Sequence, residues 1–187
     1  MSDCEDQPLA SEDRAELLRI ARVALKQWFF DGRAPVGAPH RESLLAPRSA
    51  FVTLRIDGEV RGRFGRLDAD LPLFRAIIDL TVGSATRDPR YEAVRREELP
   101  ALKIEISLLS PLARLGDKAA IEIGRHGLVV TRGASHGLLL PGIAVERAWS
   151  RETFLAETCR MAGLAASAWS EAETEVATFT TQVFAEP

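Results

Sequence analysis

The chain has 187 residues, 46% of them hydrophobic and 27% charged, which is the composition of an ordinary globular protein with enough residues for a real core. Its formal net charge of −3 argues against a dedicated nucleic-acid binder, because phosphate contacts need concentrated positive charge. The two cysteines, Cys4 and Cys159, cannot build a disulfide framework or a cysteine-based metal cluster. The N-terminus lacks the features of a signal peptide, and no run approaches the roughly 18–20 apolar residues of a membrane span, so we expect a cytoplasmic protein.

The first half of the chain predicts two helices with a β-hairpin between them. Ser11 is the expected cap of the first helix, and Asp31-Gly32 ends it. Pro72 suits the first turn of the second helix, which must stop before Asp88-Pro89 because the residue before a proline disfavours helix. The predicted elements are a disordered N-terminus over 1–10, a helix over 11–30, a hairpin over 50–65 and a helix over 72–86.

The register of the hairpin is predicted from the requirement that apolar and charged residues lie on opposite faces of the sheet. A two-residue loop, Asp57-Gly58, would pair Leu54 with Arg61 and so mix apolar and charged residues on one face. A three-residue loop, 56–58, pairs Leu54 with Val60 instead, and we predict this register. It places Val52, Leu54, Val60 and Phe64 on one face, and Phe51, Thr53, Arg55, Arg61 and Arg63 on the other. The second face would therefore carry a row of three arginines.

The second half predicts short strands followed by a helix and a final strand. Ser150 is the expected cap of the helix, with Trp149 and Phe154 in the positions of a hydrophobic staple and Gly163 at its end. Strands and helices do not alternate as βαβ units, so the predicted class is α+β with a mainly antiparallel sheet flanked by helices. The predicted strands are 102–108, 120–123, 128–131, 138–140 and 176–184.

The segment Arg61-Gly62-Arg63-Phe64-Gly65 is the strongest indication of a ligand site. Glycines expose backbone N–H groups, and the planar guanidinium fork binds phosphate or carboxylate. Two other interpretations stay open: a solvated sheet face on which Arg87 and Asp88 only pin a turn, and a surface for a partner protein. The candidate ligand-binding residues are Arg61, Gly62, Arg63, Gly65, Arg87, Asp88 and Arg90.

Other chemistry has little support in the sequence. His126 and His136 lack a convincing third ligand, so we predict no metal site and assign these histidines a turn-stabilising role. No Gly-x-Ser-x-Gly elbow, phosphate loop or dinucleotide fingerprint is present, and we predict no cofactor. Cys159 is expected to face into the apolar stripe of its helix, and the catalytic residues, if the protein is an enzyme, are unknown.

With these segments in place, the chain resembles the AMME-syndrome candidate-region (AMMECR) domain family from about residue 12 to Phe184. The resemblance implies a single domain over 11–187 with two lobes that meet at a cleft. It also implies a genomic association with Memo-like and radical-SAM proteins, as the A component of the AmmeMemoRadiSam system, but no established reaction. It is carried by Phe51-Val-Thr-Leu, Arg61-Gly62-x-Phe64-Gly65, Arg87-Asp88-Pro89-Arg90, Glu98-Leu-Pro, Ser107-Leu-Leu-Ser-Pro111, Ile121-Glu-Ile-Gly-Arg-His-Gly-Leu128, Gly137-Leu-Leu-Leu-Pro141, Thr178-Phe179 and Phe184.

Two residues depart from the family's pattern. The motif usually reads Leu-Arg-Gly-Cys-Ile-Gly, so Arg63 replaces a signature cysteine, and Gly142 replaces a glutamine. A thiol at that position is therefore unavailable to this protein. We expect an accessory protein that binds a small anionic ligand or an anionic partner surface at an Arg/Gly-lined cleft. The alternatives are an enzyme or accessory subunit of a modification pathway with the two implied partners, and an interaction scaffold without a ligand site.

Overall fold

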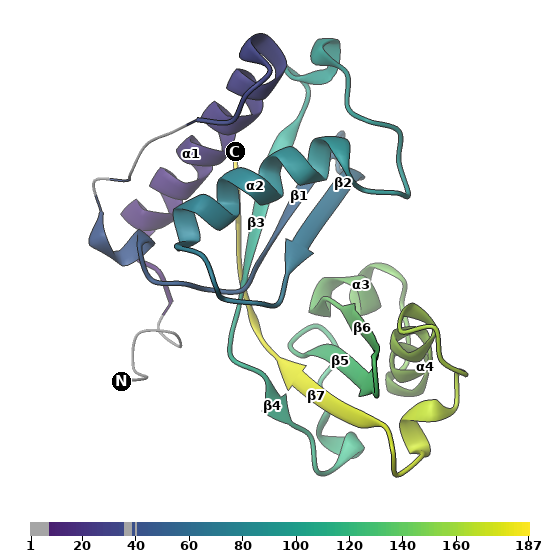
Figure 1. Ribbon diagram of the computed structural model, residues 1–187. Helices are drawn as coiled ribbons and strands as arrows, with labels where there is room; N and C mark the ends of the chain where they lie inside the picture. Colours follow the sequence, from purple (N-terminus) through teal and green to yellow (C-terminus); the bar gives the residue numbers. More distant parts are fainter. Residues whose placement is uncertain (1–7, 36–38, 40) are drawn as a thin grey trace. The chain divides into compact units, whose positions relative to one another are not determined.

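The computed structural model describes residues 8–35, 39 and 41–187, and it has the predicted α+β fold, with two antiparallel sheets flanked by helices (Figure 1). The chain divides into two compact units. The first comprises the residues up to Leu109 together with Gln182–Pro187, and the second comprises Ser110–Thr181. A single domain over 11–187 and a cleft between two lobes stay predictions. The predicted disorder of residues 1–10 lies mostly outside the described residues.

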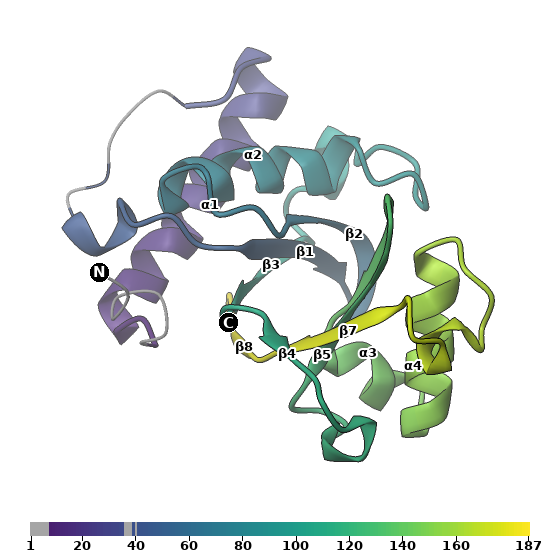
Figure 2. The same ribbon diagram turned by 60° about the horizontal axis from the view of Figure 1, so that its bottom comes forward.

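The first unit has a four-stranded sheet in the order β2-β1-β3-β8, with α1 and α2 on one face of it (Figure 2). Apolar side chains on that face, including Val52, Leu54, Ile104 and Ile106, are fully buried beneath the helices. The elements are α1 (Ser11–Asp31), β1 (Ala50–Ile56), β2 (Glu59–Arg66), α2 (Leu73–Thr86), β3 (Lys103–Leu109), β8 (Thr181–Ala185) and the short 3₁₀ helices η1 (Glu42–Leu44) and η2 (Arg96–Glu98).

The helices of this unit follow their sequence signals with one correction. α2 begins after Pro72 and ends at Thr86, as predicted. α1 ends at Asp31, and the next residue, Gly32, caps it with a φ of 68°, the left-handed conformation that glycine adopts readily. Ser11 is not the cap of α1. Ala10 occupies the cap position without a side-chain hydrogen bond, and Ser11 is the first helical residue. A serine one position inside the helix cannot reach back to cap it.

The register of the β1–β2 hairpin differs from the prediction. The loop has two residues, Asp57 and Gly58, with φ of 51° and 85°, the left-handed values that a tight hairpin loop requires. Beyond the loop, Arg55 pairs with Val60 but Leu54 pairs with Gly62, so a bulge leaves Arg61 as the extra residue of β2. The alternation of apolar residues correctly required one residue more than a two-residue loop provides. That extra residue lies in β2 and not in the loop. Val60 consequently shares the face of Arg55.

The second unit has a four-stranded sheet in the order β4-β7-β5-β6, packed against α3 and α4. Phe154 of α4 is fully buried in its core, and the Ser150 hydroxyl accepts the N–H of Thr153 at 3.2 Å, as expected of the predicted cap. The elements are β4 (Ala113–Arg114), the 3₁₀ helix η3 (Lys118–Ala120), β5 (Gly127–Arg132), β6 (Ser135–Leu139), α3 (Pro141–Glu146), α4 (Arg151–Met161), the 3₁₀ helix η4 (Ala168–Ser170) and β7 (Glu175–Phe179).

Two predicted strands of this half are wrong. Residues 120–123 form no strand, because the Asp117 carboxylate accepts the N–H of Ala119 at 2.8 Å and so favours a local turn. The predicted strand 176–184 is two strands that belong to different sheets. It is divided at Thr180, whose carbonyl and N–H both bond to Ser110 at 3.0 Å. Helix α3 was not predicted.

Gly62 has a packing role that yields a testable prediction. A Cβ at this position would lie 2.1 Å from the backbone oxygen of Ser84 in α2, and a backbone atom cannot rotate away. We expect Gly62→Ala to destabilise the protein by about 3 kcal/mol, measured by urea unfolding. Gly116→Ala is the matched control, because a Cβ there meets no atom within 4 Å. Equal stability of the two variants would contradict the close approach of α2 and β2.

Candidate functional site

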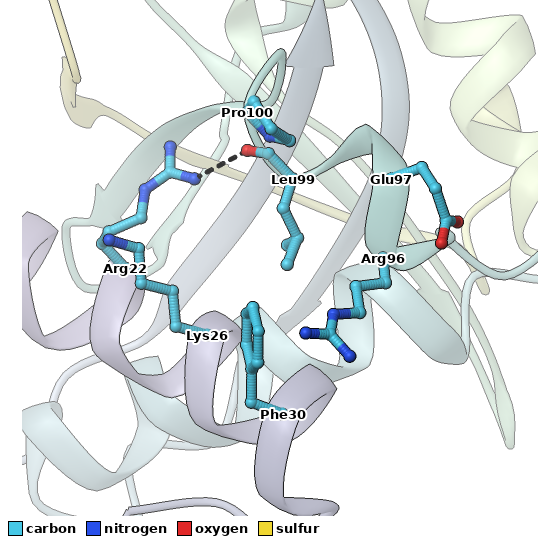
Figure 3. Close-up of a pocket in the computed structure, with 7 residues that line it drawn as sticks. All are labelled: Arg22, Lys26, Phe30, Arg96, Glu97, Leu99 and Pro100. Carbon is cyan, nitrogen blue, oxygen red and sulfur yellow. Dashed lines mark hydrogen bonds between the residues drawn. The ribbon is translucent and has the colours of Figure 1, made fainter.

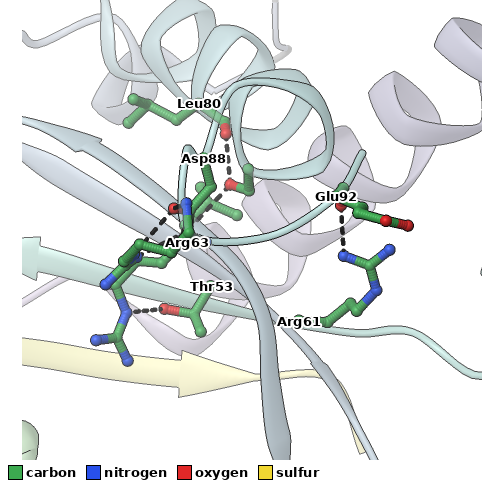
Figure 4. A network of polar contacts seen from close by, with 9 residues as sticks. Thr53, Arg61, Arg63, Leu80, Asp88 and Glu92 are labelled. Atoms are coloured by element: carbon green, nitrogen blue, oxygen red, sulfur yellow. Dashed lines mark hydrogen bonds and ion pairs between the residues drawn. The ribbon is translucent and has the colours of Figure 1, made fainter. Parts of the chain in front are cut away.

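Arg61 is bound by four acceptor atoms of its own chain. Its guanidinium donates to both carboxylate oxygens of Glu98, from Nε at 2.7 Å and from Nη2 at 3.0 Å. It also donates to the carbonyls of Glu92 at 2.7 Å and Ala93 at 3.3 Å, and Figure 4 shows the contact with Glu92. The hydrogen bond from Arg61 holds the pKa of Glu98 below its ordinary value. Arg61 therefore fastens the segment 92–98 to β2.

Gly62 and Gly65 are required by close packing. Gly62 lies against α2, and Gly65 lies under the ring of Phe51, which is its partner on β1. A Cβ at Gly65 would stand 2.0 Å from that ring. Both glycines thus have a structural reason to lack a side chain, whether or not a ligand approaches their amides.

Arg63 is anchored at its backbone and at its side chain. Its N–H donates to Asp88 at 2.8 Å, and its Nε donates to the hydroxyl of Thr53 at 3.0 Å. Thr53 alternates with Val52 and Leu54, which pack beneath the helices, so the Arg63 side chain lies on the opposite face of the sheet. Arg61 and Arg63 point away from each other in Figure 4. The predicted row of three arginines therefore does not converge on one point.

Asp88 is the centre of the polar network at the edge of β2. Its side chain is 2% exposed, and its two oxygens accept four hydrogen bonds. One comes from the N–H of Arg63, and three come from Arg90, through its backbone N–H, Nε and Nη2. Burial alone would raise the pKa of Asp88, but these hydrogen bonds outweigh burial and lower it. Since β2 is an edge strand, the Arg63 N–H has no acceptor in a neighbouring strand, and Asp88 supplies one.

Asp88 fixes a turn, residues 87–91, that presents two arginines to solvent. The Arg87 guanidinium lies 4.8 Å from the centre of the Phe64 ring and donates to the carbonyl of Asp79 at 3.0 Å. Arg90 lies 5.7 Å from the centre of the Tyr91 ring, and its side chain remains 51% exposed although it binds Asp88 in bidentate fashion. We call residues 87–91 the arginine turn. It combines a buried carboxylate with exposed cationic and aromatic groups.

The seven predicted site residues thus do not all contact one another. Arg63, Asp88 and Arg90 meet in one hydrogen-bonded network, whereas Arg61 binds Glu98 and Arg87 stacks on Phe64. That they bind an anion stays a prediction. Sequence reasoning did not identify three of the partners that hold these side chains: Thr53, Phe64 and Glu98. Each carried a usable signal, because each lies in a stretch on which the resemblance to the AMMECR family rests: Phe51-Val-Thr-Leu, Arg61-Gly62-x-Phe64-Gly65 and Glu98-Leu-Pro.

Other reactive side chains do not assemble into a second centre among the described residues. His126 accepts the N–H of Glu122 through Nδ1 at 3.0 Å and so stabilises its turn. Within the described ranges, no three His, Cys, Asp or Glu side chains are grouped so that they could hold a metal ion. Cys159 is buried, and burial raises the pKa of its thiol. No helix in the described part of the chain is both long and apolar enough to span a bilayer.

Comparisons with known proteins agree with the resemblance found in the sequence. A family model described as AMMECR1 matches residues 18–184. Protein MK0488 of Methanopyrus kandleri is 37% identical over 95% of this chain and 90% of its own length. A protein of Methanosarcina acetivorans is 38% identical over 90% of this chain and 89% of its own length. The crystal structure of an uncharacterized protein, PH0010 from Pyrococcus horikoshii, has a TM-score of 0.87 at 35% identity and covers 91% of this chain and 89% of that one.

The Asp88 network predicts a pH-dependent contribution to stability. Because the pKa of folded Asp88 is lowered, its contribution is complete above the ordinary carboxyl pKa of about 4 and is lost as the pH falls through the lower folded value. Asp88→Asn replaces an acceptor oxygen with an NH₂ group that faces donors. We expect it to lower the unfolding free energy at pH 7 by about 2 kcal/mol, a value that allows for the exposure of Arg90.

Urea unfolding of both proteins at several pH values measures this difference. It should be largest above about pH 5 and shrink as the pH falls below the ordinary carboxyl pKa of about 4. Asp70→Asn is the control, because Asp70 pairs with Arg66 but its side chain is 58% exposed. A difference that does not change with pH would show that the Asp88 carboxylate does not act through its charge.

Proposed function

The chain belongs to the AMMECR1 family, and within that family we propose that it is an accessory binding protein that recognises an anionic group at the arginine turn. The anion is either a small ligand or a phosphate or carboxylate group on a partner. The observation that carries the proposal is a buried, fully hydrogen-bonded carboxylate, Asp88, that fixes a turn whose arginines face solvent. A cytoplasmic location, predicted from the sequence, forms part of the proposal.

Charge at the arginine turn favours an anion. Asp88 is neutralised by Arg90, with which it forms a bidentate ion pair, so the charge of Arg87 remains in excess. The Arg87 guanidinium is held by the Phe64 ring on one side and by the carbonyl of Asp79, which fix its position without neutralising it. A guanidinium held in this way loses little conformational entropy when a phosphate or carboxylate binds.

The composition of the arginine turn also suits a contact with a protein partner. Arginine and tyrosine are enriched in protein interfaces, and Tyr91 is 39% exposed beside Arg90. The first partners to test are those that the resemblance implies, Memo-like and radical-SAM proteins. Their involvement, like the AmmeMemoRadiSam assignment itself, is part of the proposal and rests on kinship alone.

A thiol-based enzymatic role is less well supported by the described residues. Arg63 stands where the resemblance would place a cysteine, and Cys159 is buried with a raised pKa. A thiol with a raised pKa forms little thiolate at neutral pH and reacts slowly. A catalytic role in a modification pathway would therefore depend on other groups, supplied by a partner or a cofactor.

Thermal unfolding with inorganic phosphate, citrate and ATP tests the proposal. An anion at ten times its Kd should stabilise the protein by about 1.4 kcal/mol and raise its melting temperature accordingly. Arg87→Gln should abolish most of this shift. Arg63→Ala should retain it, because the Arg63 side chain lies on the other face of β2. Arg114→Gln, at a side chain that is 82% exposed, is the charge-matched control.

The same variants decide between the anion site and its alternatives. If none of the three anions shifts the melting temperature of the unmodified protein, a small-anion site at the arginine turn is excluded. If Arg87→Gln and Arg114→Gln reduce the shift equally, anions act through the overall charge of the protein and not through the arginine turn.

A further inference from the structure

A pocket of about 480 Å³ lies in the first unit between the C-terminal half of α1 and the segment 96–100. Arg22, Lys26 and Phe30 line it from α1, where a spacing of four residues places them on one face of the helix. Arg96, Leu99 and Pro100 form the opposite wall, as Figure 3 shows. Its volume lies in the range of about 300–1,000 Å³ that is usual for small-molecule sites. It is separate from the arginine turn in the residues that form it.

Both walls of the pocket are held in place without a ligand. Arg22 pairs with Glu186 and donates to the carbonyls of Leu99 at 3.3 Å and Leu102 at 2.7 Å. These bonds fix the segment 96–100 against α1. Glu98, within the same segment, is fixed to β2 by Arg61. A preformed pocket spares a ligand the free-energy cost of ordering its site.

The body of the pocket is apolar. Phe30 is 59% exposed although it is a large aromatic side chain, and the guanidinium of Arg96 lies 3.8 Å from the centre of its ring. Leu99 and Pro100 provide apolar surface across from it. An aromatic or aliphatic group that filled this space would remove the exposed part of the Phe30 ring from water, which is favourable.

The charged groups at the pocket are predominantly cationic. Arg22 is neutralised by Glu186, but neither Lys26 nor Arg96 forms an ion pair with a carboxylate in the described part of the chain. Glu97 is the one acidic residue among those that line the pocket, and in Figure 3 its carboxylate is turned away from Phe30 and Leu99. Lys26 and Arg96 lie on opposite sides of the Phe30 ring in Figure 3, so a ligand with one negative charge would meet a cation at either edge of the apolar surface.

We propose that this pocket binds a small monocarboxylate with an aromatic or aliphatic body. The carboxylate pairs with Lys26 or Arg96 at the edge of the pocket, and the body packs on Phe30, Leu99 and Pro100. A bare inorganic anion would leave the apolar walls exposed, and a neutral hydrocarbon would leave the two cations without a counter-charge. The proposal does not depend on the function of the arginine turn.

Titration with 3-phenylpropanoate, followed by amide chemical shifts of the full chain, tests this site. We expect saturable shifts at the residues of the pocket. Two probes separate the parts of the ligand: 3-phenylpropan-1-ol has the same ring without the charge, and propanoate has the charge without the ring. Each should bind at least about five-fold more weakly than 3-phenylpropanoate, because each forfeits one of the two favourable contacts.

Substitutions in the pocket provide a second test. Lys26→Gln and Arg96→Gln should each weaken binding of 3-phenylpropanoate about two- to five-fold, as expected for ion pairs near the surface. Arg95→Gln is the matched control for the second variant, because Arg95 is adjacent in sequence but its side chain is 74% exposed and contacts Glu92. Phe30→Ala should weaken binding while the fold is retained, because its ring is largely exposed.

Three results would overturn the proposal. They are the absence of saturable shifts up to the solubility limit of 3-phenylpropanoate, equal binding of the alcohol, and binding that Lys26→Gln, Arg96→Gln and Phe30→Ala all leave unchanged. Arg87→Gln distinguishes this site from the arginine turn: it should leave the affinity for 3-phenylpropanoate unaltered, whatever its effect on the response to phosphate.

Discussion

The carboxylate of Asp88 is the interaction on which the edge of the first sheet depends. β2 has no neighbouring strand on its outer side, and the N–H of Arg63 would be left without a partner there. Asp88 accepts that N–H and also the guanidinium of Arg90, so one buried group both completes the edge of a sheet and shapes the arginine turn. An aspartate is suited to this role because it can accept several hydrogen bonds and donates none.

The arginines of the Arg61–Gly65 motif stabilise the fold through hydrogen bonds within the chain. Arg61 has four acceptors from its own chain, and a ligand that displaced them would leave Glu98 without its charged partner at considerable cost. The segment 87–100 is consequently fixed at two points, by Asp88 at its start and by Glu98 near its end. Both proposed sites use this segment, since the arginine turn begins it and the pocket wall ends it.

The sequence predicted local structure well and tertiary partners poorly. The limits of α2 followed from Pro72 and Asp88-Pro89, and the Ser150 cap from its own neighbours, because the deciding contacts span only a few residues. Arg61 and Glu98 lie 37 residues apart, and no periodicity connects them. The β-branched and aromatic residues of 176–184 continue on both sides of Thr180, although the chain changes sheets there, because such residues favour a strand without indicating which strand lies beside it.

Arg63 shows how a motif can keep its structural role while its side chain changes. Asp88 binds the backbone N–H at this position, so the edge of β2 can be completed with any residue except proline. The side chain donates through Nε to the hydroxyl of Thr53 on the other face of the sheet. A cysteine, which the resemblance leads one to expect, and the arginine found here are therefore equally compatible with the edge. What differs is the chemistry offered on the Thr53 face: a thiol could act as a nucleophile or a metal ligand, whereas a guanidinium can only donate hydrogen bonds and carry charge.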